Sequence, residues 1–504
     1  MLASSATRLL ASWRGWALLA LVGTLVIGWR IHDPRTLWID EGARIQLSQY
    51  DWATIVRAHE RESHPPGHAL LLKAWRRLGD IVGAPRHIAY ERASGLALWL
   101  GWTAWLWFGL RRLLGARVGA AAAWCLALNP LVVDAVGTLR MYGMAITLST
   151  GAALALALSL HAAKRDGTRA LGFLGVYFAL AVPAFYTHFF TMAVLGLVGL
   201  AWLVAAWRML GWRAPHVRWG VAVQWLGVAC FLPWIPMMHA QFAWYSGLDT
   251  SWRTPATVLN LARQFLEWHT YGEGPMGLVK ASDGDPLTLF FFLNVLVIAA
   301  AAAGLVKLRR GRVPRDAAFW GAVACAFVAV AFIVFTWGTT RLGIVHIYHG
   351  TRYNALGTAF WVVALVAGAS HSAIVLRARW LLPAVVAMLL VQAMISSCSD
   401  EAWRLRRGLH TTIGRHEADY FTPGQRLYLG EECLYPYVRG HFEGYDVRSM
   451  WEIGDHPADQ PDADVLLVYT WPPFASQQTN MLLINLRDTD MADSAEYTRY
   501  GVPG

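Results

Sequence analysis

Apolar runs of about 20 residues recur along this chain, and they limit its fold more than any other feature. A helix of about that length crosses a bilayer, and a single segment inside lipid can satisfy its own backbone hydrogen bonds only as a helix. The chain has 504 residues, of which 56% are hydrophobic and only 15% are charged. A soluble protein of this length would need more charge on its surface. The sequence therefore predicts a mainly α, polytopic membrane protein.

The spacing of the apolar runs predicts about 11 transmembrane helices. The stretch FYTHFF is the only break in the apolar sequence from 170 to 206, so two spans are placed there. The predicted spans lie near 12–31, 93–110, 116–133, 142–162, 170–187, 189–206, 219–238, 288–306, 317–336, 355–375 and 380–396.

Basic residues test this arrangement. With a cytoplasmic N-terminus, the five short cytoplasmic loops all carry Lys or Arg, as the positive-inside rule requires. The formal charge of +10 is therefore an orientation signal, and no clustered basic patch points to nucleic acid. The loop residues are Arg111, Arg112, Arg117, Lys164, Arg165, Arg169, Arg208, Arg213, Arg218, Lys307, Arg309, Arg310, Arg312, Arg315, Arg377 and Arg379.

Three segments then face the other side: 32–92, 239–287 and 397–504. Residues 1–396 form the predicted transmembrane catalytic domain, with the outer loop 32–92 as part of it. The tail 397–504 is no longer membrane-like. Its stretches RLYLGE and DVLLVYTW are typical of short strands, so we expect a small soluble α/β domain there, for which a parallel sheet is one arrangement.

The first outer loop contains two amphipathic stretches, EGARIQLSQYDWATIVRA and PGHALLLKAWRRLG. Both are too short and too charged to span a membrane. We expect them to lie flat at the interface, with Trp52 and Trp75 at headgroup depth.

Two polar clusters stand out in this loop. Asp40 and Glu41, in LWIDEGAR, suit either a helix N-terminus or a carboxylate base at the membrane surface. ESHPPGH contains Glu62, His64 and His68 beside a helix start, and it is either a polar turn or part of a site. The spacing of these residues matches no standard metal-ligand signature.

Further polar residues lie at the outer ends of later spans. Arg140 and Tyr142 occur in TLRMYG, where an arginine would be costly unless it were paired, useful or snorkelling to the headgroups. His188 occurs in YTHFF, and a lone histidine at a helix end is usually structural. YHGTRYN carries Arg352 and Tyr353, together with His346 and His349. Arginine forks match phosphate oxygens, so this set suits a substrate with a phosphate head and a lipid tail.

Six segments occur in a familiar order: LWIDEGARIQLSQ, HPPGHALLLKAW, NPLVVDAVGTLRMYGMAITL, FYTHFF, FLPWIP and TRYNALG. Over about residues 30 to 375 the chain resembles the GT-C glycosyltransferases that use polyprenyl-phosphate sugars. Within that class it is similar to bacterial relatives of protein O-mannosyltransferases and to aminoarabinose lipid A transferases. The family's bulky pair after the prolines is replaced here by Gly67 and His68.

The resemblance implies a role for each matching residue. Asp40 corresponds to the catalytic base and Glu41 to its neighbour. Glu62 and His64 match the acidic-x-His-Pro-Pro motif. The implied substrate-binding set is Glu62, His64, Arg140, Tyr142, His188, Arg352 and Tyr353.

An inverting transfer at the outer face of a bacterial inner membrane is implied, with the site and the tail facing the periplasm. The implied partners are a polyprenyl-phosphate-linked sugar donor, membrane lipids and an acceptor protein, lipid or glycan. No cofactor is required by the sequence; a divalent metal stays open, without assigned ligands.

Two alternatives remain. A multi-span transporter or lipid-linked sugar flippase would need ionisable residues in mid-span and discontinuous helices in matched halves, and the sequence shows neither. A transferase that uses a diphosphate-linked oligosaccharide differs only in its donor.

Overall fold

The computed structural model describes most of the helical body and the strands of the tail. The described residues are 12–31, 41, 44–45, 47–59, 64–84, 88–163, 165–246, 257, 299, 317–341, 351–375, 377–378, 380–398, 426–429, 446–449, 465–470, 480–485 and 498–500. Asp40, Glu62 and the predicted span 288–306 lie outside this set. Arg352 and Tyr353 are described only as backbone in a helix.

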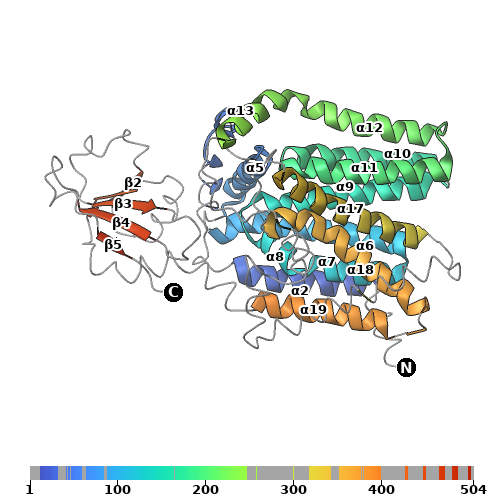
Figure 1. The fold of residues 1–504 in the computed structure, drawn as a ribbon. Helices are drawn as coiled ribbons and strands as arrows, with labels where there is room; N and C mark the ends of the chain where they lie inside the picture. The colour runs from blue at the N-terminus through green and yellow to red at the C-terminus, as the bar shows by residue number, and fades with distance from the viewer. Residues whose placement is uncertain are drawn as a thin grey trace.

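The body is a bundle of long helices (Figure 1), so the predicted mainly α class is confirmed. The helices are α2 (Trp13–Ile31), α4 (Trp52–Ala58), α5 (Gly67–Val82), α6 (Ile88–Leu114), α7 (Ala116–Ala127), α8 (Pro130–Gly137), α9 (Met141–Ala163), α10 (Gly167–Phe185), α11 (Phe189–Leu210), α12 (Pro215–Phe231), α13 (Ile235–Ser246), α17 (Ala317–Arg341), α18 (Thr351–Val375) and α19 (Leu381–Cys398).

Within the described residues, six helices are long and apolar enough to cross a membrane, or up to seven if one bent pair counts as a single span. The chain is thus a multi-pass membrane protein. The count of about 11 stays a prediction. The two spans predicted on either side of FYTHFF are confirmed as α10 and α11, which are separated at residues 186–188.

The predicted span 116–133 is not one straight helix. It is formed by two helices, α7 and α8, and the chain bends by 52° between them. Asn129 precedes Pro130, and a residue before proline is pushed out of the helical region; its ψ is 132°. The Asn129 carboxamide oxygen then caps α8 by accepting from the Leu131 N–H at 3.0 Å. The expectation of no discontinuous helix was therefore wrong at this position, because the Asn-Pro pair breaks the apolar run locally.

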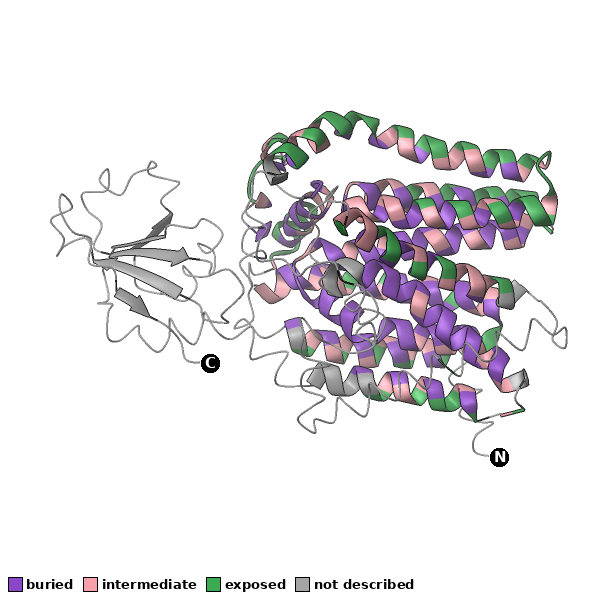
Figure 2. Ribbon diagram, in the orientation of Figure 1, coloured by how far each residue is buried: buried purple, intermediate pink, exposed green. Residues whose placement is uncertain are grey.

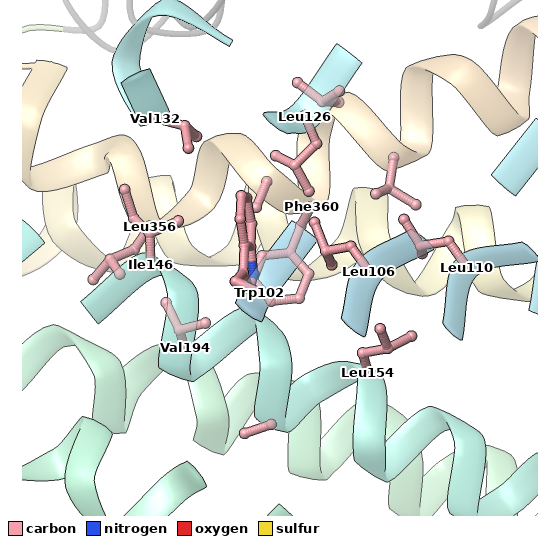
Figure 3. Packing of buried hydrophobic residues seen from close by; sticks show 14 of the residues in the cluster. Trp102, Leu106, Leu110, Leu126, Val132, Ile146, Leu154, Val194, Leu356 and Phe360 are labelled. Carbon is pink, nitrogen blue, oxygen red and sulfur yellow. The ribbon is translucent and has the colours of Figure 1, made fainter. Parts of the chain in front are cut away.

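The hydrophobic core lies around α9 and α18, the most enclosed of the span-length helices (Figure 2). Figure 3 shows side chains from several helices meeting there, among them Trp102 and Phe360. The indole N–H of Trp102 donates to the Thr150 hydroxyl at 2.7 Å, and that of Trp99 donates to the Ala127 carbonyl at 3.1 Å. These bonds satisfy polar groups that would be costly to bury alone.

Close packing of α6 on α8 depends on Gly95. A Cβ atom at this position would lie 2.1 Å from the Val136 carbonyl oxygen. Only glycine allows the two backbones to approach in this way, as small residues do between membrane helices. This contact brings the start of α6, with Arg92, close to the turn that follows α8.

The outermost helical segment is α12 followed by a 3-10 turn (Leu232–Trp234) and α13. We call residues 215–246 the outer arm. It is mostly exposed along its length (Figure 2), as expected of a helix that faces lipid. In Figure 1, α13 bends over the end of the bundle that holds α5, while the α11–α12 connection lies at the opposite end.

The tail contributes a five-stranded sheet in the order β2-β1-β3-β4-β5. The strands are β1 (Arg426–Leu429), β2 (Asp446–Ser449), β3 (Val465–Thr470), β4 (Asn480–Asn485) and β5 (Thr498–Tyr500). The two strands expected from RLYLGE and DVLLVYTW are confirmed as β1 and β3. The sheet is mixed: β1 pairs in parallel with β2 and β3, whereas β3–β4 and β4–β5 are antiparallel.

Candidate active site

Glu41 is fully buried and makes a bidentate ion pair with Arg92 of α6. The Arg92 Nε donates to Glu41 Oε1 at 3.0 Å, and its Nη2 donates to Oε2 at 2.8 Å. Glu41 Oε1 also accepts from the backbone N–H of Leu139 at 2.7 Å. Charge-assisted hydrogen bonds of this geometry are stronger than bonds between neutral groups. Both side chains of the pair are almost completely buried. Glu41 thus joins three segments: LWIDEGAR, the start of α6 and the TLRMYG turn.

Sequence reasoning missed Arg92. The signal was present, because YERAS places an arginine at the outer start of an apolar run. That is the same observation that singled out Arg352. Arg92 is only 1% exposed, which an arginine tolerates only when it is paired.

Arg140 follows Leu139 directly and lies in the turn between α8 and α9. Its guanidinium carbon is 5.2 Å from the centre of the Tyr142 ring, within cation–π range. Tyr142 is buried in the first turn of α9. The predicted pair Arg140 and Tyr142 is therefore brought together.

Three rings from three distant segments meet beside Arg140. The centroid of His64 is 4.5 Å from that of His188 and 6.4 Å from that of Tyr142. His188 and Tyr142 are 5.5 Å apart. The first loop, the start of α9 and the start of α11 therefore share one buried polar cluster, which we call the ring cluster (His64, Tyr142 and His188).

His188 also has the structural role considered for it. It is the N-cap of α11, and its Nδ1 accepts from the Phe190 N–H at 3.1 Å. The tautomer is then defined, with the proton on Nε2 directed away from the cap.

Gly67 determines how the first loop docks on the α10–α11 turn. Its N–H donates to the Tyr186 carbonyl at 2.7 Å. A Cβ at Gly67 would lie 2.5 Å from that same oxygen. The departure from the family's bulky pair is thus tied to a close backbone contact, which places His64 beside His188.

Burial lowers the pKa values of the histidines in this loop. Desolvation lowers the pKa of His68 to about 3, and electrostatic interactions with Arg44 and His59 act in the same direction. The pKa of His64 is lowered well below its usual value, first by desolvation and then by neighbouring His188 and Arg44. These imidazoles are neutral at neutral pH and serve as hydrogen-bonding groups rather than as cations.

Arg44 and His59 add a second polar layer that sequence reasoning did not single out. The His59 Nδ1 donates to the Ile55 carbonyl at 2.6 Å, which leaves Nε2 to accept from Arg44 Nη1 at 3.3 Å. Both side chains are buried. Arg44 lies within the LWIDEGARIQLSQ segment, but its contact with His59 joins positions 15 apart, and only the tertiary packing reveals it.

The interfacial helices differ from the expectation. The first amphipathic stretch is interrupted, because Asp51 starts α4 by accepting from the N–H groups of Ala53 and Thr54 at 2.9 and 3.0 Å. Trp52 is exposed and flanked by the cations of Lys73 and Arg77, at 5.6 and 5.2 Å from its ring.

Headgroup depth for Trp75 stays a prediction, and the structure shows which contacts this partly buried side chain makes. It stacks on Tyr90 at 5.3 Å and donates its indole N–H to the Tyr90 carbonyl at 2.8 Å. The amphipathic pattern did not reveal this contact, because Tyr90 belongs to a different helix.

The described residues contain no group of three or more His, Cys, Asp or Glu side chains arranged to hold a metal ion. Asp40 and Glu62 lie outside those residues, as do the side chains of Arg352 and Tyr353, so their predicted roles carry no geometry. Glu41, His64, Arg140, Tyr142 and His188 all lie at the same end of the bundle, joined by the contacts above.

No family model matches the chain, and no curated protein is similar to it. Among solved structures it is similar to the Archaeoglobus fulgidus oligosaccharyltransferase in complex with Zn and sulfate, with 10% identity, a TM-score of 0.45, and coverage of 90% of this chain and 67% of that one. It is also similar to ArnT from Cupriavidus metallidurans bound to undecaprenyl phosphate, with 17% identity, a TM-score of 0.40, and coverage of 95% and 97%. Apo ArnT gives 16% identity, a TM-score of 0.40, and coverage of 91% and 93%.

Proposed function

We propose that this protein is a membrane glycosyltransferase that moves a sugar from a polyprenyl-phosphate donor to a hydroxyl- or phosphate-bearing acceptor. The reaction takes place at the outer face of the membrane and inverts the configuration at the sugar carbon. One observation carries the proposal: the HPP, RMY and YTH motifs meet in the ring cluster, and the acid motif is bonded to the residue before Arg140.

Asp40 is the proposed base. It directly precedes Glu41 in the chain. Glu41 is held by Arg92 and Leu139, so the backbone beside Asp40 is anchored one residue away. An ordinary Asp has a pKa of about 3.9, so it removes the acceptor proton in concert with attack on the sugar.

Glu41 itself is proposed as a positioning residue. Both of its oxygens are bonded to Arg92, and burial keeps it from water. A carboxylate held in this way fixes its own backbone, and through it the position of the residue that precedes it in the chain. The catalytic pair expected from the sequence is therefore divided between a reacting acid and a supporting one.

The leaving phosphate is proposed to bind near Arg140, with Arg352 as a second cation. Preorganised charge of this kind is worth about 2.7–4 kcal/mol for a single lost donor. Tyr142 holds Arg140 over its ring face, and His64 and His188 line the same cluster as neutral donors. Glu62 and Tyr353 complete the proposed substrate-binding set.

The distribution of buried charge favours transfer over transport. Among the described residues, the buried Asp, Glu, Lys, Arg and His side chains lie in the first loop or near the outer ends of helices, apart from His371 of α18. A transporter would place such groups along a path through the middle of the membrane. The bend between α7 and α8 is a discontinuity, but it is a single one, within the described residues, and α8 leads from it directly to the TLRMYG turn.

The test is transfer by purified protein in liposomes, using labelled polyprenyl-phosphate mannose and polyprenyl-phosphate aminoarabinose as donors. We expect one donor to lose its sugar to an added acceptor fraction. Asp40→Asn should lower the rate by at least about 100-fold without changing membrane insertion.

Asp51→Asn is the matched control, since asparagine caps a helix as well as aspartate does and α4 is retained. Near-normal transfer by Asp40→Asn would exclude Asp40 as the base. Movement of the intact lipid-linked sugar across the bilayer without transfer would favour the flippase, and activity with a diphosphate-linked oligosaccharide alone would favour the third class.

A further inference from the structure

The outer arm bends at FLPWIP (231–236), a motif to which the proposed mechanism gives no role. Pro233 lies inside the 3-10 turn that separates α12 from α13. The arm packs mainly against α10, and most of its length is exposed. At its bend and on α13, however, it makes two attachments to the segments that carry the ring cluster.

The first attachment is Tyr186. Its hydroxyl donates to the Cys230 carbonyl on α12 at 2.9 Å, and its ring centroid lies 5.3 Å from that of Phe231 and 6.0 Å from that of Trp234. The carbonyl of the same residue accepts from Gly67. Tyr186 therefore connects the bend of the arm to the start of α5.

The second attachment is Gln241 on α13, which is only 1% exposed. Its Nε2 donates to the His59 carbonyl at 2.6 Å and to the His64 carbonyl at 3.0 Å. Both protons of the amide are thus used on two backbone positions of the first loop. A buried carbonyl without a donor is costly, so this one nitrogen stabilises both positions.

Each of the two carbonyls belongs to a residue with a polar side-chain contact. His59 accepts from Arg44, and His64 contacts His188 and Tyr142. Gln241 therefore fixes the backbone of both layers of the site from outside, through an element that contributes no side chain to the ring cluster itself.

We propose that Gln241 is a positioning residue for His64 and His59, and that the FLPWIP bend exists to bring this amide over the first loop. The bend is needed because α13 must turn from the direction of α12 to cover α5 (Figure 1). The catalytic part of this inference rests on the proposed function, whereas the structural part does not.

Hydrogen exchange of the full-length protein in detergent tests the structural part without any substrate. Gln241→Met keeps the length of the side chain but has no donor, and Gln241→Glu is isosteric and presents oxygen to two carbonyl oxygens. In both variants, the amides of His64 and of residues 67–70 should exchange at least about tenfold faster. Gln224→Met is the matched control, because the Gln224 amide donates only to Gly220 of its own helix.

Kinetics of sugar transfer test the catalytic part. With the donor that the wild type uses, Gln241→Glu should raise the KM about tenfold and change the kcat less than about threefold, because His64 is assigned to binding. A fall in kcat alone would indicate loss of folded enzyme and would overturn the positioning role. Equal exchange in the Gln241 and Gln224 variants would overturn the inference as a whole.

The two proposals can fail separately. Faster exchange in the Gln241 variants together with no transfer by the wild type would leave the positioning role standing and remove the proposed function. If the wild type transfers sugar but the Gln241 variants show unchanged exchange and KM, the proposed function stands and the positioning role of Gln241 falls.

Discussion

At the scale of single residues, the acid pair of LWIDEGAR is better understood through Arg92 than through its own two side chains. A buried ion pair is stable only when its geometry is good and its remaining bonding capacity is used. The Glu41–Arg92 pair meets both conditions, with two parallel bonds and a third from Leu139 N–H. Its effect is to set the distance between the acid segment and Arg140.

We expect Arg92→Met to lower the free energy of unfolding by about 3–5 kcal/mol, because it leaves the Glu41 carboxylate buried without its partner. The double variant Glu41→Gln/Arg92→Met should recover much of this loss and still transfer sugar poorly. Thermal unfolding in detergent measures the first effect, and a transfer assay measures the second.

Arg57→Met is the control for the loss of an arginine, since Arg57 is exposed on α4. It should change stability by no more than about 0.5 kcal/mol. Wild-type transfer by the double variant would show that the pair does not position the site.

At the scale of elements, the site depends on how the start of α5 meets the turn between α10 and α11. The FYTHFF break leaves the Tyr186 carbonyl outside the helix ladder, and Gly67 N–H donates to it. The same break places His188 at the start of α11, where it caps the helix and contacts His64. One local interruption of an apolar run therefore supplies both an attachment point and a site residue.

Gly67→Ala should destabilise the protein by about 1–3 kcal/mol, since the added methyl group would overlap the Tyr186 carbonyl and force the two segments apart. The melting temperature in detergent measures the effect. Gly172→Ala on α10 is the control, because no atom lies within 4 Å of a Cβ at that position. Equal melting temperatures for the two variants would contradict the close contact.

At the scale of the whole molecule, the chemistry and the basic loops lie at opposite ends of the bundle. The first loop and the α8–α9 and α10–α11 turns meet in the ring cluster. The α6–α7, α9–α10 and α11–α12 connections carry arginines instead. A bundle with this asymmetry has a defined orientation in a membrane.

We expect alkaline phosphatase fused after residue 504 to be active, and the same reporter fused after Arg213 to be inactive. The reason is that the positive-inside rule keeps the Arg208–Arg218 connection in the cytoplasm and sends the tail to the periplasm. A fluorescent protein that folds only in the cytoplasm should give the opposite pair of results. Reversal of both reporters would overturn the proposed orientation.

The sequence by itself determined the features that depend on local patterns. Apolar run length predicted the described spans, FYTHFF predicted the α10–α11 break, and the stretches RLYLGE and DVLLVYTW predicted β1 and β3. The ordered motifs singled out Glu41, His64, Arg140, Tyr142 and His188 before any geometry was known. Each of these signals is contained within a few residues, so no knowledge of packing was needed.

Only the tertiary structure decided which residues meet. Glu41 and Arg92 are 51 positions apart, and Gln241 and His64 are 177 apart, so no local period connects them. Their contacts follow from how helices pack, which in turn depends on close approaches such as that of Gly95 to Val136. Apolar periodicity indicates that one face of a helix is buried, but it does not indicate which residues that face packs against. The contacts of Glu41, the stacking of Trp75 on Tyr90 and the attachment through Gln241 therefore appear only when the chain is folded.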